Sequence, residues 1–252
     1  MDLQFVSRLG LLLVRVGALA ALAPGLGSGF APAAVRVGLS LLLAITLAPT
    51  ASVPPIASAG VLTAVALHEA AVGLALGLSV RALTAAFEAA GHLIGFQLGF
   101  SYATVVDPQS GAGSNVVAAL YGSLALLFFL GLNGHHAVVR ALAASYDAAP
   151  IGIGGFDGRP LVESVARILA HVLTVGVQLA APVIAALLLV EVALGLLTKA
   201  APLLNLMAVG FQVRTAVGLA VLALVIHTVP AMVNRAIETV IGIAGRAVIA
   251  FR

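Results

Sequence analysis

The feature that most constrains this chain is the length of its apolar stretches. Residues 168–190 and 215–234 contain no acidic or basic residue except a histidine in each, and charged residues bound both stretches. A helix needs about 20 apolar residues to cross a bilayer core. Only 8% of the chain is charged and 62% is hydrophobic, whereas soluble domains carry about 25% charged residues. The sequence therefore predicts an all-α, polytopic helical membrane protein.

Further candidate helices end at prolines, glycines or charged residues. They cover residues 9–23, 33–48, 61–83, 84–105 and 116–132. We expect one integral-membrane domain over residues 1–252, with a polar connecting segment at about 145–166 that is exposed or docked on a partner. Asp2 and Arg15 disrupt the pattern of a secretory signal, so the N-terminal helix is expected to be retained.

The charges and glycines favour helices that pack against other subunits. Basic residues occur singly along nearly every connection, so the usual bias of Lys and Arg toward cytoplasmic loops is missing. The same scatter argues against nucleic acid as a partner. Small residues let helix backbones approach closely, and several glycines recur mostly at four-residue spacing: Gly73, Gly77, Gly91, Gly95 and Gly99.

Two similar stretches place a carboxylate inside an apolar run, EAAVGL at 69–74 and EVALGL at 191–196. A charge at membrane depth is costly unless it is paired or hydrated. Glu69 and Glu191 could therefore form structural pairs with Arg81 and Lys199, face a partner, or relay protons. The candidate buried or interface polar residues are Glu69, Arg81, Glu88, Glu191, Lys199 and Arg214.

The sequence contains no pattern that indicates an enzyme, a metal site or a cofactor. There is no cysteine, which excludes disulfides and thiol chemistry. His135 and His136 are adjacent, so on a helix they point about 100° apart. HEAAV at 68–72 lacks the second histidine of a zinc-protease helix. We therefore expect a non-enzymatic protein without a cofactor.

The polar stretch FSYATVVDPQSGAGSNVV at residues 100–117 stands apart from its surroundings. Irregular backbone at membrane depth survives only inside protein or along an aqueous cavity. The stretch is a simple turn if it lies at a membrane face, and a plug if it lies in a pore. The candidate plug residues are Asp107, Pro108, Gln109, Ser110, Gly111, Ala112, Gly113 and Ser114.

Nearly the whole chain resembles a known family. The resemblance depends on APGLGSGFAPAAVRVGLSLLLAITLAP, HEAAVGLALGLSVRALTAAFEAAGHLIGFQLGFSYATVVDPQSGAGS, FFLGLNGHHAVVRALAASYDAAPIG and APVIAALLLVEVALGLLTKAAPLLNLMAVGFQVRTAVGL. In order and spacing these stretches resemble the FliR family of flagellar type III export-gate proteins. Matching family positions include Gly134, His135, Pro202, Asn205 and Gly210, whereas Leu203, Met207 and Gln212 replace the usual Gln, Phe and Pro.

The resemblance implies a place in the bacterial inner membrane, within the flagellar basal body. Its expected partners are FliP-like, FliQ-like and FlhB-like subunits, membrane lipid, and transiently unfolded export substrates. The family resemblance also implies Gly-rich helical hairpins that pack into a larger helical export-gate assembly, with residues 107–114 closing the pore at rest.

Three alternatives remain open from the sequence. The chain could be the equivalent subunit of a virulence injectisome. It could be a stand-alone proton-coupled secondary transporter that uses intramembrane Glu69 and Glu191. It could also be a scaffold that nucleates the gate and lines no pore.

Overall fold

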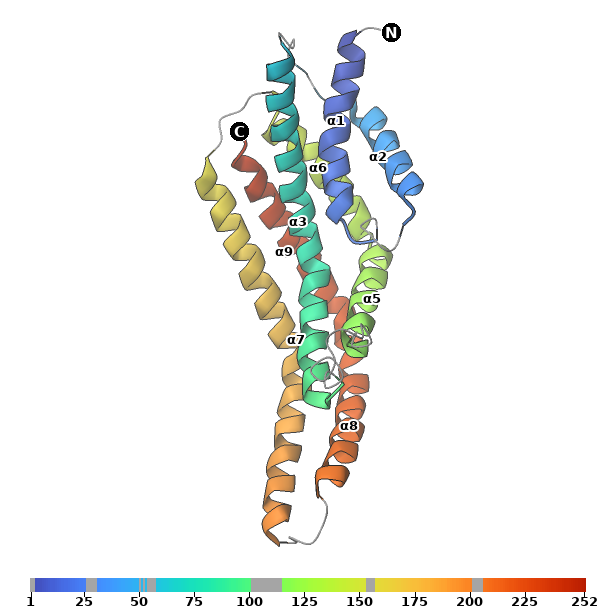
Figure 1. The fold of residues 1–252 in the computed structure, drawn as a ribbon, viewed down its shortest axis with the longest axis vertical. Helices are drawn as coiled ribbons and strands as arrows, with labels where there is room; N and C mark the ends of the chain where they lie inside the picture. Colours follow the sequence, from blue (N-terminus) through green and yellow to red (C-terminus); the bar gives the residue numbers. More distant parts are fainter. Residues whose placement is uncertain are drawn as a thin grey trace. The chain divides into compact units, whose positions relative to one another are not determined.

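The computed structural model describes residues 3–25, 31–49, 51, 53, 58–100, 115–152, 157–200 and 206–252. Within these ranges the regular structure is entirely helical, which confirms the predicted fold class. The elements are α1 (Leu3–Leu22), α2 (Ala33–Leu47), α3 (Ala59–Leu98), α5 (Val116–Gly131), α6 (Gly134–Ala148), α7 (Gly158–Ala200), α8 (Leu206–Val225), the 3-10 turn η1 (Ile226–Thr228) and α9 (Val229–Ile249) (Figure 1).

Among the residues that the structure describes, three helical stretches are long and apolar enough to cross a membrane, or four if α5 and α6 are counted as one broken span. The three are Ala59–Leu98, Gly158–Lys199 and Gly210–Ile249, of 40, 42 and 40 residues. At 1.5 Å per residue each is about 60 Å long, roughly twice the ~30 Å bilayer core. Each helix is therefore longer than a single crossing requires.

The predicted boundary between helices 61–83 and 84–105 is wrong, because α3 runs without a break across it and ends at Leu98. Arg81 and Glu88, which stand on either side of that boundary, are half-buried along α3. Alanine, leucine, threonine and phenylalanine separate them, and none of these ends a helix. The prediction of a helix at 116–132 is confirmed by α5.

The chain divides into two compact units. The first unit comprises Met1–Leu83, Phe129–Ala170 and Arg235–Arg252. Its core contains large apolar side chains from α1, α3, α6 and α9, and it also encloses two charged residues. The fully or nearly fully buried members include Leu11, Leu12, Val16, Val72, Leu76, Leu142, Val240 and Ile243, together with Arg15 and Glu69.

The second unit comprises Thr84–Phe128 and His171–Asn234. Here α7 and α8 form an antiparallel hairpin: Glu191 pairs with Arg214, Gly210 approaches Leu194, and Gly218 approaches Leu187. The buried apolar side chains of this unit include Phe87, Ile94, Leu98, Tyr121, Leu179, Val183 and Leu187.

The short turn η1 follows from Pro230, which has no amide hydrogen to donate to the carbonyl of Ile226. The amide of Val229 donates to that carbonyl instead. The Thr228 hydroxyl donates to the carbonyl of Val225 at 2.8 Å, and a ring nitrogen of His227 contacts the carbonyl of Leu224. The helical path therefore tightens at the proline and continues into α9.

Candidate functional site

A fully buried ion pair joins α1 and α3 in the first unit. Arg15 and Glu69 are both fully buried. The Nε of Arg15 donates to Oε2 of Glu69 at 2.7 Å, and one terminal nitrogen donates to Oε1 at 3.0 Å. Such two-point contacts between guanidinium and carboxylate are among the strongest hydrogen bonds in proteins.

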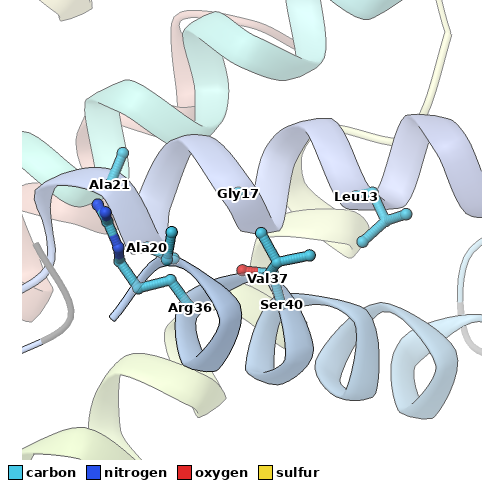
Figure 2. A pocket seen from close by; sticks show the side chains of 8 residues that line it. Leu13, Gly17, Ala20, Ala21, Arg36, Val37 and Ser40 are labelled. Carbon is cyan, nitrogen blue, oxygen red and sulfur yellow. The ribbon is translucent and has the colours of Figure 1, made fainter. Parts of the chain in front are cut away.

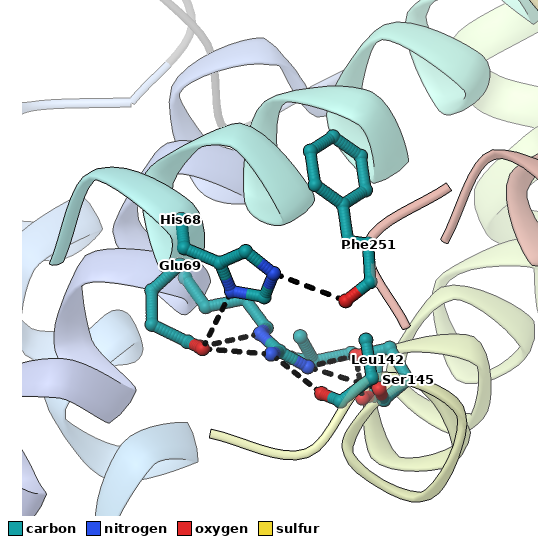
Figure 3. A network of polar contacts seen from close by, with 7 residues as sticks. His68, Glu69, Leu142, Ser145 and Phe251 are labelled. Carbon is teal, nitrogen blue, oxygen red and sulfur yellow. Dashed lines mark hydrogen bonds and ion pairs between the residues drawn. The ribbon is translucent and has the colours of Figure 1, made fainter. Parts of the chain in front are cut away.

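Arg15 also contacts the C-terminal turn of α6 (Figure 3). One terminal nitrogen donates to the carbonyl and hydroxyl oxygens of Ser145, both at 3.0 Å, and the other donates to the carbonyl of Ala149 at 2.8 Å. A guanidinium has five N–H donors, and these contacts supply five acceptors. A cation is favourable at this end of a helix, where carbonyls lack helical partners.

Two aromatic side chains surround the pair. The ring of Tyr146 lies 4.3 Å from the guanidinium carbon of Arg15, a distance typical of a cation–π contact. His68 lies between Glu69 and Phe251 (Figure 3). Its Nε2 is 3.0 Å from the carbonyl of Phe251, and its Nδ1 is 3.6 Å from the Glu69 carboxylate. The Arg15–Glu69 clamp, as we call this cluster, therefore joins α1, α3, α6 and the C-terminal end of the chain.

Glycines position the clamp. A Cβ added at Gly73 would lie 2.3 Å from the carbonyl oxygen of Arg15, and one at Gly77 would lie 3.0 Å from Cβ of Leu22. Gly73 and Gly77 stand one and two helical turns beyond Glu69, on the same face of α3. Their lack of a side chain lets α1 approach closely enough for Arg15 to reach Glu69.

A second arrangement fixes both ends of the segment that contains the predicted plug. Residues 107–114 themselves lie outside the described residues. Before the segment, Gly99 has φ 85°, its amide donates to the carbonyl of Phe96, and the amide of Phe100 donates to the carbonyl of Gly95. This is a Schellman motif, in which a left-handed glycine ends the helix.

After the segment, Asn115 caps α5. Its Oδ1 accepts hydrogen bonds from the amides of Val117 at 3.1 Å and Ala118 at 3.2 Å, as expected of an asparagine N-cap. Its Nδ2 donates to the carbonyl of His92 on α3 at 3.3 Å. Both helix ends that border residues 101–114 are therefore held by specific hydrogen bonds.

Glycines again allow the close approach. A Cβ at Gly95 would lie 2.1 Å from the side-chain oxygen of Asn115, and one at Gly91 would lie 2.4 Å from Cα of Ala118. We call Gly91, Gly95, Gly99 and Asn115 the loop anchor. Its glycines belong to the four-residue series that the sequence showed, whereas the role of Asn115 was not anticipated. An asparagine directly before an apolar run is the N-cap signal that could have indicated it.

The other predicted polar residues are dispersed. Glu191 pairs with Arg214 at 3.1 Å, and both side chains are about one-third exposed. Lys199 is exposed near the end of α7. Glu88 lies against α5, since a Cβ at Gly122 would be 3.1 Å from its Cγ. The partner that the sequence suggested for Glu69 was Arg81, but the structure gives Arg15, and the suggested Glu191–Lys199 pair is replaced by Glu191–Arg214.

The family positions are placed only in part. Gly134 begins α6 directly after Asn133, whose φ of 59° is left-handed. A Cβ at Gly134 would lie 2.3 Å from the ring of Phe129. His135 is exposed and its ring contacts that of His136, while Gly210 is buried against α7. Pro202, Leu203 and Asn205 lie outside the described residues, as do the side chain of Met207 and its contacts.

Within the described ranges, no group of three or more His, Cys, Asp or Glu side chains is arranged to hold a metal ion. The carboxylate of the clamp is occupied by a guanidinium, so it offers no free ligand there. The Arg15–Glu69 clamp can fix helices against one another. The loop anchor provides two well-defined ends for the segment between α3 and α5.

The chain is similar to known flagellar proteins. Residues 6–240 match the family described as "Bacterial export proteins, family 1". The "Flagellar biosynthetic protein FliR" of Bacillus subtilis (strain 168) is 32% identical over 176 residues, which are 69% of this chain and 68% of that protein. The protein of the same name from Escherichia coli (strain K12) is 35% identical over 177 residues, 68% and 66% of the two chains. That of Pectobacterium carotovorum subsp. carotovorum is 32% identical over 220 residues, 86% and 83% of the two chains. The chain belongs to family 1 of the bacterial export proteins.

Proposed function

We propose that this chain is a non-enzymatic core subunit of the flagellar type III protein export gate in the bacterial inner membrane. In this proposal it helps to form and close the channel through which unfolded flagellar proteins leave the cytoplasm. The observation that carries the proposal is family membership across residues 6–240, together with relatives that are named as flagellar biosynthetic proteins. FliP-like, FliQ-like and FlhB-like subunits are its proposed partners.

The length and surface of the helices support assembly with other subunits. The three long helical stretches exceed a bilayer core about two-fold in length, so part of each extends beyond the hydrocarbon layer. In Gly158–Lys199 and Gly210–Ile249, only 22% of the most apolar window is buried within the chain. The apolar remainder requires lipid or neighbouring protein to cover it.

The loop anchor supports the proposal that residues 107–114 close the channel. A segment that obstructs a path must keep a fixed position at its two ends, and the Schellman motif and the Asn115 cap supply two fixed ends. The segment has small and polar side chains, with no bulky group that would prefer lipid. It could leave a pore without breaking a packed core.

Deleting residues 108–114 tests the proposed closure. In cells that express the whole export gate, we expect the deletion variant to assemble at parent levels and to let small ions cross the inner membrane at rest. Membrane potential and the uptake of a small dye would measure the leak. The matched control is the same variant in cells that lack the FliP-like subunit, where the leak should disappear because the path belongs to the assembly.

If the deletion variant assembles, exports normally and leaks nothing, residues 108–114 are an ordinary turn. The alternative of a stand-alone secondary transporter predicts that the purified chain moves a solute in liposomes and that Glu69→Gln abolishes this movement. The paired state of Glu69 argues for a structural role, and absence of transport by the purified chain would agree with the export-gate proposal. Export of flagellar hook protein, measured against an injectisome substrate, separates the flagellar from the virulence system.

A further inference from the structure

An open groove lies between α1 and α2, and the known family relationship assigns it no role. The two helices pack antiparallel, since Arg8 in the first half of α1 donates to the carbonyl of Ala48, directly after α2. The groove has a volume of about 320 Å³. Leu13, Gly17, Ala20, Ala21 and Val37 form most of its lining, so its surface is largely apolar. Figure 2 shows Leu13 toward one end and the Arg36 side chain beside Ala21 toward the other.

Arg36 gives the groove a charged end. Its Nε is shielded from solvent and has no hydrogen-bond acceptor within the part of the chain that the structure describes. Such a buried donor is costly when it stays unpaired. An anion at this end would satisfy the guanidinium, which can contact two phosphate oxygens at once.

The N-terminus of α2 lies at the same end. Pro32 is its N-cap and gives no side-chain hydrogen bond to the first turn. The amides of Val35 and Arg36 donate to the carbonyl of Pro32, and Ala33 and Ala34, the first two residues of the helix, are exposed. The N-terminal end of a helix favours negative charge, which adds to the attraction of Arg36.

We propose that this groove binds an anionic glycerophospholipid, with the phosphate at Arg36 and part of one acyl chain along the apolar floor. The charge and shape of the groove match one molecule of this class: one cationic end, one apolar trough, and a position on a helix pair whose outer face is apolar. Val35, Leu42 and Ile45 on the other side of α2 are each more than half exposed. An apolar face of this kind requires lipid or neighbouring protein to cover it, and the proposal assigns it to lipid.

Gly17 makes the proposal testable without disturbing the fold. A Cβ added there meets no heavy atom of the described chain within 4 Å. Gly17→Leu should therefore fill the trough while α1 and α2 keep their packing. Gly10 on the same helix is equally open but does not line the groove, so Gly10→Leu is the matched control.

The experiment uses the absence of tryptophan from the sequence. Val37→Trp introduces a reporter in the lining of the groove, at a position that is 67% exposed, and Leu224→Trp introduces a second, separate reporter at a position 70% exposed on α8. The full chain is placed in nanodiscs of phosphatidylglycerol and phosphatidylcholine at fixed composition, with bromine on one lipid or on the other. The ratio of the two quenching values measures which lipid lies next to each tryptophan.

At Val37→Trp we expect phosphatidylglycerol to be enriched above its bulk fraction, and at Leu224→Trp we expect the bulk fraction. Arg36→Gln should lower the enrichment about five-fold, which corresponds to ~1 kcal/mol for one basic residue near anionic lipid. Gly17→Leu should lower it as well, and Gly10→Leu should not.

Enrichment that is equal at the two reporters, or that persists in Arg36→Gln, would overturn the lipid site. Persistence in Gly17→Leu would overturn the seating of an acyl chain in the trough. If enrichment is lost when the chain is assembled with its partner subunits, a protein surface covers the groove in the gate and the proposal is wrong. Its failure would leave the proposed export function unaffected, because the leak assay does not depend on this groove.

Discussion

The Arg15–Glu69 clamp makes a strong prediction about stability. In Glu69→Gln the amide keeps one oxygen but directs an NH₂ group toward the donors of Arg15, so the contacts of 2.7 Å and 3.0 Å cannot both persist. The guanidinium would then remain fully buried without a counter-charge. Breaking a buried ion pair by changing one partner costs about 3–5 kcal/mol. We expect the free energy of unfolding to fall by that amount.

The assay is reversible unfolding of the full chain in mixed micelles of mild detergent and SDS, followed by circular dichroism. Arg15→Met should destabilise the chain similarly, because it strands the Glu69 carboxylate. The double variant Arg15→Met/Glu69→Gln should be less destabilised than the sum of the two single changes, by about 2 kcal/mol or more, since neither charge is then left alone. Glu163→Gln, which alters an exposed pair with Arg167, is the matched control and should unfold at the parent midpoint.

Two results would refute this reasoning. If Glu69→Gln unfolds at the parent midpoint, the clamp does not stabilise the fold. If the single changes add without coupling, Arg15 and Glu69 act independently. A third result would favour the proton-relay hypothesis: a Glu69→Gln variant that is stable and assembles, but moves no export substrate.

Three further changes probe the glycines and the loop anchor. Gly73→Ala should lower the free energy of unfolding by about 1–3 kcal/mol, because the added Cβ would overpack against the backbone of Arg15. Gly10→Ala should leave it unchanged or raise it by up to ~1 kcal/mol, because the position is open. Unfolding midpoints in detergent compare the two variants. Asn115→Ala should cost about 1–2 kcal/mol through loss of the N-cap and should raise hydrogen exchange at the first amides of α5; unchanged exchange there would contradict the cap. Gly99→Ala should lower the free energy of unfolding by about 1 kcal/mol, because a residue with a Cβ is strained at a φ of 85°. A variant as stable as the parent chain would show that the left-handed glycine is not needed at this helix end.

The sequence predicted the fold class because hydrophobic length is a property of single segments. It predicted both ends of α5 to within a residue, with the Asn133-Gly134 pair as the signal for its end, although the capping role of Asn115 at its start was not anticipated. It failed within α3, where charges were interpreted as boundaries. Arg81 and Glu88 are instead half-buried side chains of one continuous helix, and burial of that kind depends on neighbours that the local sequence does not contain.

Arg15 shows the same limitation more sharply. In the sequence it interrupts an apolar helix, and we used it only to argue against a secretory signal. An unpaired cation at membrane depth demands a partner of opposite charge, and Glu69 makes the same demand. Matching the two charges that stand inside apolar helices would have suggested the pair. Only packing identifies the other contacts of Arg15, which are the hydroxyl and backbone carbonyl of Ser145 and the backbone carbonyl of Ala149.

The two similar stretches at 69–74 and 191–196 show why local pattern does not determine contact. In each, a glycine follows the glutamate by four residues and lies on the same helical face. At Gly73 that face is closed by α1, and Glu69 is fully buried with Arg15. At Gly195 a Cβ would meet no heavy atom of the described chain within 4 Å, and Glu191 is about one-third exposed beside Arg214. The difference comes from the approaching helix: α1 brings its backbone against Gly73 and an arginine to Glu69, whereas α8 brings Arg214 to Glu191 and Gly210 to Leu194 but leaves Gly195 without a close contact among the described residues. The same six-residue pattern therefore forms a sealed clamp in one unit and a partly exposed pair in the other.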